Sequence, residues 1–301
     1  MKKILLALAI FLVFYSNVSA QGGLDGLTFL KLGVGGRSLG MGEAYSAIAN
    51  DPAATYYNPA AMSLSKSSQI LLMHKSWFQD VNTEYFAAQT PWENFAFGIS
   101  INSTSVDNIE IRTAPGPAEG TFTSRNASVG LSASYSFDSS FAVGATLNYL
   151  YEKILINDAS GLGFNIGAIY QGPEDIRLAV AVNNLGSMSA LREDATKLPT
   201  SIKVGAARTM PVTSIGPAST ATAAVDIVDY TVEKKAHVQI GGEINYEQTF
   251  AARLGYLTGY DSRSFTAGVG VYYGLVNLDY AYASFQYDLG TTHTFSLGFK
   301  F

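Results

Sequence analysis

The sequence contains no cysteine among its 301 residues. This absence excludes a disulfide framework, a lipid anchor on a cysteine, thiolate metal sites and cysteine nucleophiles. Charged residues are also scarce, at 14%, where a typical soluble domain has about 25%. The net charge is −5 and the basic residues are scattered. The sequence therefore offers no basic patch for nucleic acid, and we expect no nucleic-acid partner.

Long apolar runs are missing as well. After residue 20 no stretch approaches the roughly 20 apolar residues that a helix needs to cross a bilayer. The run Ile4–Tyr15 follows two lysines and precedes small residues at positions 18–20. This order is typical of a secretory signal peptide. We expect residues 1–20 to be removed before Gln21, and any membrane crossing by the remaining chain to use strands.

Aromatic residues and glycine are plentiful, with 18 Tyr, 17 Phe and 29 Gly. From about Ser68 onward, apolar and polar residues alternate in segments that are separated by turn residues. Side chains alternate between the two faces of a strand, so each segment is apolar on one face only. About fourteen segments can be counted, at 68–78, 82–91, 95–102, 129–137, 141–152, 162–170, 176–182, 202–206, 219–230, 238–246, 250–256, 265–273, 276–282 and 294–301.

This pattern predicts an all-β fold, a closed transmembrane antiparallel barrel of about fourteen strands over residues 67–301. Short connections at 91–94, 138–140, 172–175, 247–249 and 274–275 follow even-numbered segments, whereas the longest, 103–121 and 184–199, follow odd-numbered ones. Such parity is typical of outer-membrane barrels, with the long connections outside the cell. A secreted β-sandwich is the alternative, and it gives no reason for the parity.

The pattern of the last segment, 294–301, is typical of a membrane strand. Phe295, Leu297, Phe299 and Phe301 share one face, opposite Thr294, Ser296, Gly298 and Lys300. An aromatic residue ending such a strand resembles the signal by which barrels are recognised for insertion into the outer membrane. We therefore expect a bacterial outer-membrane location and contact with its lipid.

Residues 21–66 do not alternate. Glycines precede a helical stretch at 43–50, and two proline turns follow. A phosphate-binding loop is rejected because no strand of a parallel unit precedes the glycines. We interpret the segment as a plug in the barrel lumen, where glycine allows close approach to the wall. The motif residues are Gly33, Gly35, Gly36, Arg37, Gly40, Gly42, Asp51, Pro52, Asn58 and Pro59.

At this point the sequence carries a family resemblance. The run LKLGVGGRSLGMGEA at 30–44, then NDPA at 50–53 and YNPA at 57–60, resembles the start of the PorV/PorQ family of FadL-like outer-membrane barrels. LDYAY at 278–282 and LGTTH at 289–293 are similar to that family's end. The resemblance implies fourteen strands, an amino-terminal plug and a part in type IX protein secretion, with secretion subunits or exported proteins as partners. FadL relatives instead pass small hydrophobic molecules.

Two hypotheses about function follow. In the first, the chain is a non-enzymatic partner of protein secretion that binds through its outer face and the connections at 108–120 and 184–198. In the second, it transports small hydrophobic molecules. Transport predicts an apolar pocket between plug and wall, lined by residues such as Leu30, Leu32, Met41 and Met62.

Charges that face the lumen are the main candidates for site residues, because a charge on the lipid face is unfavourable. By parity these are Arg177, Lys203, Asp226, Glu243, Arg253, Asp279 and Lys300. Their mixed signs favour ion pairs that anchor the plug over a polar conduction path.

No enzyme, cofactor or metal is expected. The three histidines have no metal-site spacing, and no Gly-x-Ser-x-Gly elbow of a serine hydrolase is present.

Overall fold

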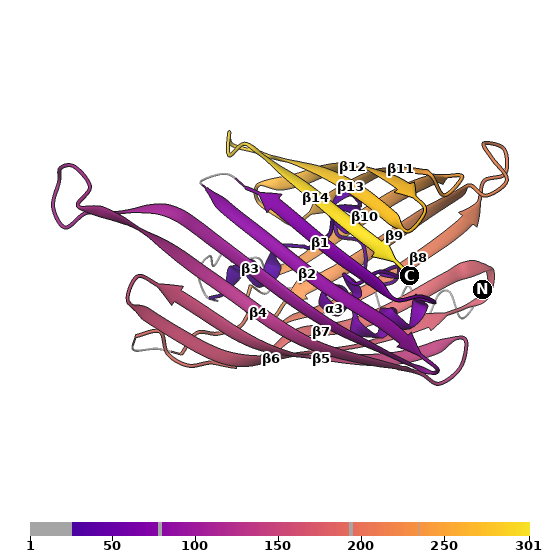
Figure 1. The fold of residues 1–301 in the computed structure, drawn as a ribbon, viewed down its shortest axis with the longest axis horizontal. Helices are drawn as coiled ribbons and strands as arrows, with labels where there is room; N and C mark the ends of the chain where they lie inside the picture. Colours follow the sequence, from indigo (N-terminus) through magenta and orange to yellow (C-terminus); the bar gives the residue numbers. More distant parts are fainter. Residues whose placement is uncertain (1–25, 78–79, 193–194, 234) are drawn as a thin grey trace.

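The protein forms a closed barrel (Figure 1). The computed structural model describes residues 26–77, 80–192, 195–233 and 235–301. The expected signal peptide, residues 1–20, lies outside them. Each strand is antiparallel to its neighbours in sequence order, and β1 (Gln69–Ser76) pairs with β14 (Thr291–Lys300) to close the wall. The fourteen strands found in the described residues confirm the predicted fold.

The remaining strands are β2 (Val81–Trp92), β3 (Phe95–Ile111), β4 (Gly120–Ser136), β5 (Phe141–Ile154), β6 (Asn157–Gln171), β7 (Ile176–Met188), β8 (Ser201–Pro211), β9 (Thr220–Tyr230), β10 (Lys235–Tyr246), β11 (Phe250–Thr258), β12 (Arg263–Tyr273) and β13 (Val276–Phe285). The helices are short: η1 (Thr28–Lys31), α2 (Gly36–Gly40), α3 (Ala54–Tyr57), η2 (Pro59–Leu64) and η3 (Pro173–Asp175). No helix among the described residues is long and apolar enough to span a bilayer.

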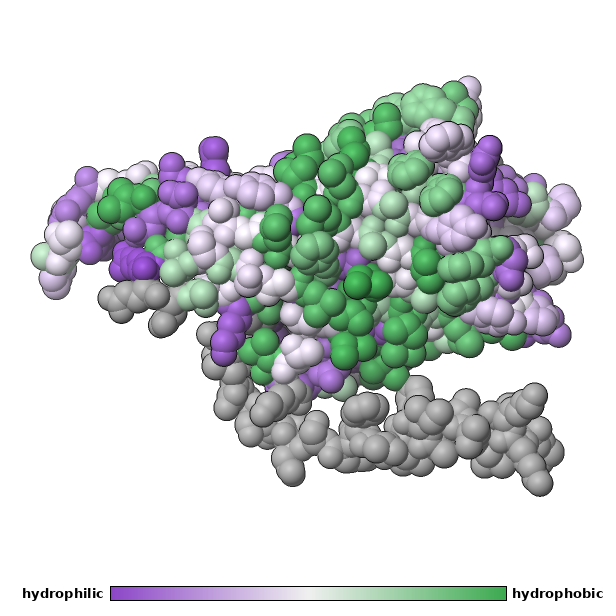
Figure 2. Space-filling model, turned by 90° about the horizontal axis from the view of Figure 1, so that it is seen from below, coloured by the Kyte–Doolittle hydropathy of each residue, from purple (hydrophilic) through white to green (hydrophobic). Residues whose placement is uncertain are grey.

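The wall has an apolar outer face and a more polar inner face. On β4, Leu131 is 61% exposed while the next residue, Ser132, is 6% exposed. On β14, Phe295 faces out, and Thr294 and Ser296 face in. Hydrophobic residues gather around the middle of the barrel, with hydrophilic residues toward both ends (Figure 2). Such a belt is the part of an outer-membrane barrel that contacts hydrocarbon, so the protein lies in the outer membrane.

Two predicted connections are much shorter than expected. Strand β3 continues to Ile111 and β4 begins at Gly120, so the predicted connection 103–121 is mostly a β-hairpin that projects from one end of the barrel (Figure 1). Likewise β7 continues to Met188, which shortens the connection predicted at 184–199. These extensions could not be predicted from alternation, because a register shift interrupts each of them, between Val106 and Ile109 on β3 and at Asn183 and Asn184 on β7.

The parity of the connections holds only in part. The longest connection, 189–200, does follow the odd-numbered β7. The turn after β5, however, is two residues, Leu155 and Ile156, and the connection after the even-numbered β8, 212–219, is as long as the one after β3, 112–119. The end of the barrel that carries the β3–β4 hairpin is called the outer end below. The opposite end, where β1 starts and β14 stops, is the periplasmic end, as in outer-membrane barrels generally.

Residues 26–65, called the inner segment below, lie inside the barrel. Helix α2 contacts β11 to β14, and η2 contacts β2 to β6. Gly26 N donates to Lys197 O (3.0 Å) near the outer end, and Gln69 Nε2 donates to Asn50 O (3.1 Å) near the periplasmic end. The inner segment therefore runs from the outer end, around the wall, to the start of β1.

Small residues on both sides let the inner segment touch the wall. Gly40 meets Gly268, and a Cβ on Gly241 would meet Met41. Gly42, at φ 62°, adopts the left-handed conformation that glycine tolerates best, and it packs on the backbone of Gly255. Because the backbones are this close, side chains larger than glycine do not fit at these wall positions.

Adjacent glycines on β10 test this packing. Gly241 faces Met41, whereas Gly242 faces outward with open space around its Cβ position. Gly241→Ala should destabilise the barrel by about 1–3 kcal/mol, the usual range for overpacking, and Gly242→Ala should have little effect. Urea unfolding in detergent micelles measures both. Equal stability of the two variants would show that the inner segment does not press on the wall here.

Candidate functional site

An apolar cluster lies at the outer end of the lumen. It joins three residues of the inner segment to the wall and is called the mouth cluster below: Leu27, Phe29, Leu30, Leu150, Ala159, Met188 and Leu198. Leu32 and Leu191 pack against it. Leu27 has φ 50° and precedes the turn η1, which directs Phe29 and Leu30 into the cluster. Burying each large side chain contributes about 1.5–3 kcal/mol.

Polar contacts add to the apolar packing of the inner segment at this end. Lys31 forms an ion pair with Glu233, and its Nζ lies 5.1 Å from the centre of the Tyr230 ring. Tyr56 Oη donates to Leu30 O (2.7 Å). Burial alone would raise the pKa of Glu233, but Lys31 outweighs it and holds that pKa below its usual value. The mouth cluster is thus an apolar site filled by the chain's own side chains.

The apolar pocket predicted from Leu30, Leu32, Met41 and Met62 does not exist as one site. Leu30 and Leu32 belong to the mouth cluster. Met41 and Met62 are fully buried in the larger core that the inner segment forms with the wall. The prediction grouped residues by polarity alone and did not capture the turn that the chain makes after Leu32.

An ion-pair network fixes the inner segment in the periplasmic half of the lumen. Arg37 donates to both carboxylate oxygens of Glu243 (2.8 and 2.7 Å). Arg253 also donates to Glu243 (2.6 Å) and to Asp279 (2.7 Å). The wall residues Glu243, Arg253 and Asp279 are each at most 5% exposed. Paired charges of this kind are stable in a closed space, where an unpaired charge would be unfavourable.

The other predicted lumen charges lie at different depths in the barrel. Asp226 is buried and accepts from Ser46 N (2.9 Å) and Ser46 Oγ (2.8 Å). Lys203 is buried, and its Nζ lies 4.9 Å from the centre of the Tyr57 ring. Arg177 pairs with Asp175 at the periplasmic rim, and Lys300 is exposed at the same rim. Five of the seven therefore lie deep in the lumen and two lie at its edge.

Further charges in the lumen were missed, among them Arg263, Glu43 and Lys75. Arg263 pairs with Glu43, and Lys75 Nζ donates to Gly33 O (2.9 Å). Parity along β1 would have placed Lys75 on the same face as Leu71 and Met73. Glu43 could not be found this way, because the inner segment has no regular alternation.

The predicted plug motif supplies both turns and contacts. Asn58 Oδ1 accepts from Ala60 N (3.1 Å) at the start of η2, and Asn58 Nδ2 donates to Ser46 O (3.1 Å). Asp51 accepts from Ala53 N (3.0 Å), just after the position of Pro52. Gly36 N donates to Ser296 Oγ of β14 (2.7 Å). The remaining motif glycines, Gly33, Gly35, Gly40 and Gly42, lie within the inner segment, and Pro59 contacts Gly144 of β5.

The histidines are dispersed. His74 contacts Glu84 (2.6 Å) on the outer face, and His237 contacts Glu233 (3.2 Å) at the outer end. His293 contacts Tyr280 (2.8 Å). Within the part of the chain that the structure describes, no group of His, Asp and Glu could hold a metal ion.

Comparisons with known proteins agree with this architecture. The toluene transporter TodX of Pseudomonas putida matches with a TM-score of 0.63 at 13% identity, covering 89% of this chain and 98% of that chain. A Pseudomonas aeruginosa FadL homologue matches with a TM-score of 0.53 at 12% identity, covering 89% and 98%. At these identities the likeness establishes the fold alone. No curated protein matches the sequence.

The closed wall and its apolar belt define the class of the protein, which is an outer-membrane β-barrel with a fold similar to that of the FadL homologue. Within that class, the chain belongs to the uncharacterised protein family UPF0164, whose model matches residues 19–190.

Removing one carboxylate tests the ion-pair network. Glu243→Ala leaves two arginines facing each other without their shared partner, which should destabilise the barrel by about 3–5 kcal/mol. Glu174→Ala removes the exposed pair with Arg208 and should change stability by about 1 kcal/mol or less. Urea unfolding of both variants gives the comparison. A small loss for Glu243→Ala would mean that the network does not hold the inner segment.

Proposed function

We propose that the protein passes small hydrophobic molecules through the outer membrane, with residues 21–66 as a plug and residues 67–301 as the wall. The mouth cluster carries this proposal. It is an apolar site at the outer end, it is filled by Leu27, Phe29 and Leu30, and an incoming hydrophobic molecule of similar size could replace them. Apolar pockets with a few polar groups at their edge are typical of sites for such ligands.

The fold comparisons support the same function. The similar structures include a protein described as a toluene transporter and a FadL homologue. In the present conformation the inner segment fills the lumen, with Val34, Tyr45 and Tyr57 fully buried. Passage therefore requires the inner segment to move. We expect residues 26–32 to move first, because apolar contacts dominate there, whereas Arg37 is fixed by the ion-pair network.

A reversible crosslink tests the movement. A Cβ on Gly26 would lie 3.5 Å from Thr196 Cβ, within the roughly 3.5–4.5 Å that a disulfide spans. The chain has no other cysteine. In cells that express Gly26→Cys/Thr196→Cys, oxidation should reduce uptake of radiolabelled toluene to the level of cells without the protein, and a reductant should restore it.

Each single cysteine variant, oxidised in parallel, is the control. Unchanged uptake with the crosslink fully formed would contradict a passage that needs residues 26–32 to leave the mouth cluster. Uptake no higher than in cells without the protein, before any oxidation, would contradict the transport function itself.

A PorV/PorQ-type role in protein secretion is the second candidate, and the projecting hairpin favours it. Beyond Val106, β3 pairs only with β4, and before Arg125, β4 pairs only with β3. The hairpin formed by residues 107–124 thus presents two free strand edges to the surroundings. Free edges are surfaces on which an extended segment of another protein can add as a strand.

Replacing residues 108–122 by a two-residue Asn-Gly turn, which keeps the pairing of Val106 with Ser124, tests this role. The shortened chain should keep its heat-modifiable migration on gels, because the wall below Val106 is intact. It should lose the secretion subunits or exported proteins that copurify with the full chain from native outer membranes. Two results would contradict a role in secretion. Either no secretion subunit or exported protein copurifies with the full chain, or the shortened chain copurifies with the same proteins as the full chain.

A further inference from the structure

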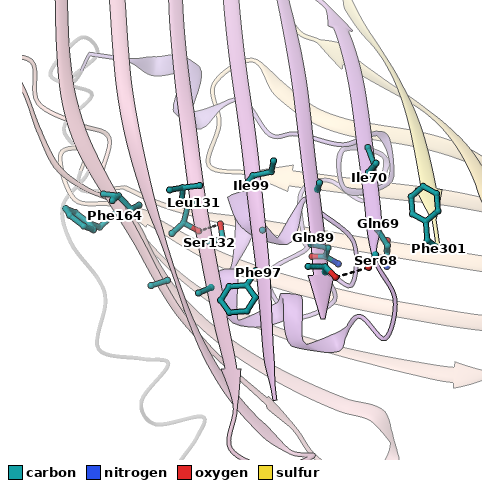
Figure 3. Close-up of a pocket in the computed structure, with 17 residues that line it drawn as sticks. Ser68, Gln69, Ile70, Gln89, Phe97, Ile99, Leu131, Ser132, Phe164 and Phe301 are labelled. Carbon is teal, nitrogen blue, oxygen red and sulfur yellow. Dashed lines mark hydrogen bonds between the residues drawn. The ribbon is translucent and has the colours of Figure 1, made fainter. Parts of the chain in front are cut away.

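A groove of about 820 Å³ crosses the outside of the wall over β1 to β6 (Figure 3). It is separate from the lumen, since most of its side chains are on the lipid-facing side. Its floor contains the small residues Ala88, Ala133 and Ala145. Larger side chains such as Phe97, Leu131 and Phe164 flank this floor. The hollow exists because alanines occupy lipid-facing positions beside bulky residues.

Strand register shows that the groove changes depth in the membrane. Ile70 pairs with Ala88, and the row of paired residues continues through Ile99, Leu131 and Leu147 to Phe164. Ile70 is the second residue of β1, at the periplasmic end. Phe164 lies seven residues before Gln171, the periplasmic end of β6. The groove therefore starts at the periplasmic interface and rises toward the middle of the hydrocarbon.

The interfacial end of the groove is polar. Ser68, Gln69 and Thr90 line it, and the hydroxyl groups of Ser68 and Thr90 are 2.8 Å apart. The exposed Lys66 comes two residues before Ser68 in the chain, at the same end of the barrel, and it forms no ion pair with another residue that the structure describes. Cationic and hydroxyl groups at this level match a phosphate group.

We propose that the groove binds one phospholipid of the periplasmic leaflet. Its phosphate lies at the end with Lys66, Ser68 and Thr90, and one acyl chain follows the alanine floor toward Phe164. Both the charge at one end and the rise toward the membrane centre fit a lipid in this orientation. A molecule without a headgroup would gain only from the apolar part.

Filling the floor tests the acyl-chain site. Ala133→Leu/Ala145→Leu places larger apolar groups in the groove on positions that face hydrocarbon, so the barrel should still fold. In native mass spectrometry of the full chain, titrated with palmitoyl-oleoyl phosphatidylglycerol, the unmodified protein should bind one lipid tightly. The filled variant should bind it about tenfold more weakly or worse. Ala206→Leu/Ala223→Leu, on lipid-facing positions of β8 and β9, should bind like the unmodified protein.

The headgroup contact has its own test. Lys66→Gln should weaken binding of phosphatidylglycerol and leave binding of the uncharged palmitoyl-oleoyl glycerol unchanged. Lys153→Gln, exposed at the outer end of β5, should change neither. Heat-modifiable migration verifies folding of every variant. Equal phosphatidylglycerol affinity in the filled variant and the unmodified protein would overturn the proposal, as would an equal loss in the control on β8 and β9.

Discussion

Pairing of the first strand with the last is the constraint on which the rest of the structure depends. Hydrocarbon offers no hydrogen-bond partner to a backbone group, so a sheet in a membrane must have no free edge. Strands β1 and β14 meet over eight residue pairs, from Gln69 with Lys300 to Ser76 with His293. Closure turns each strand's two faces into an outside and an inside. The alternation of apolar and polar residues follows from that division.

The inner segment fills the lumen, and different interactions hold it at the two ends. In the periplasmic half, Arg37 is bound by Glu243 in a network with Arg253 and Asp279, and the inner segment packs on wall glycines. At the outer end, apolar contacts of Leu27, Phe29 and Leu30 dominate. The inner segment is thus held mainly by ion pairs at its periplasmic end, and by apolar packing together with the Lys31–Glu233 pair at its outer end.

The outside is equally uneven. Most of the belt carries bulky side chains, but Ala88, Ala133 and Ala145 leave a hollow over β1 to β6. Because strands in a barrel are tilted, a row of paired residues changes depth as it crosses them. A groove along such a row joins the interface to the membrane centre, which is also the path of an acyl chain.

The strands of the wall could be predicted from the sequence, because lipid-facing residues such as Leu131 alternate with polar inward-facing residues such as Ser132. The same alternation placed Glu243, Arg253 and Asp279 on the inner face, where the structure has them buried. It was wrong at 103–121, where a register shift between Val106 and Ile109 interrupts the alternation. The mouth cluster was not predictable, because Phe29 meets Met188 only through the path of an irregular segment.

Spin labels on single cysteines along β4 test the closed, lipid-facing wall most directly, since the chain has no native cysteine. Oxygen dissolves in hydrocarbon, so labels at positions 129, 131 and 133 should relax rapidly with oxygen in a reconstituted bilayer. Labels at 130, 132 and 134 should be protected. Accessibility that does not alternate along β4 would contradict the barrel as it is described above.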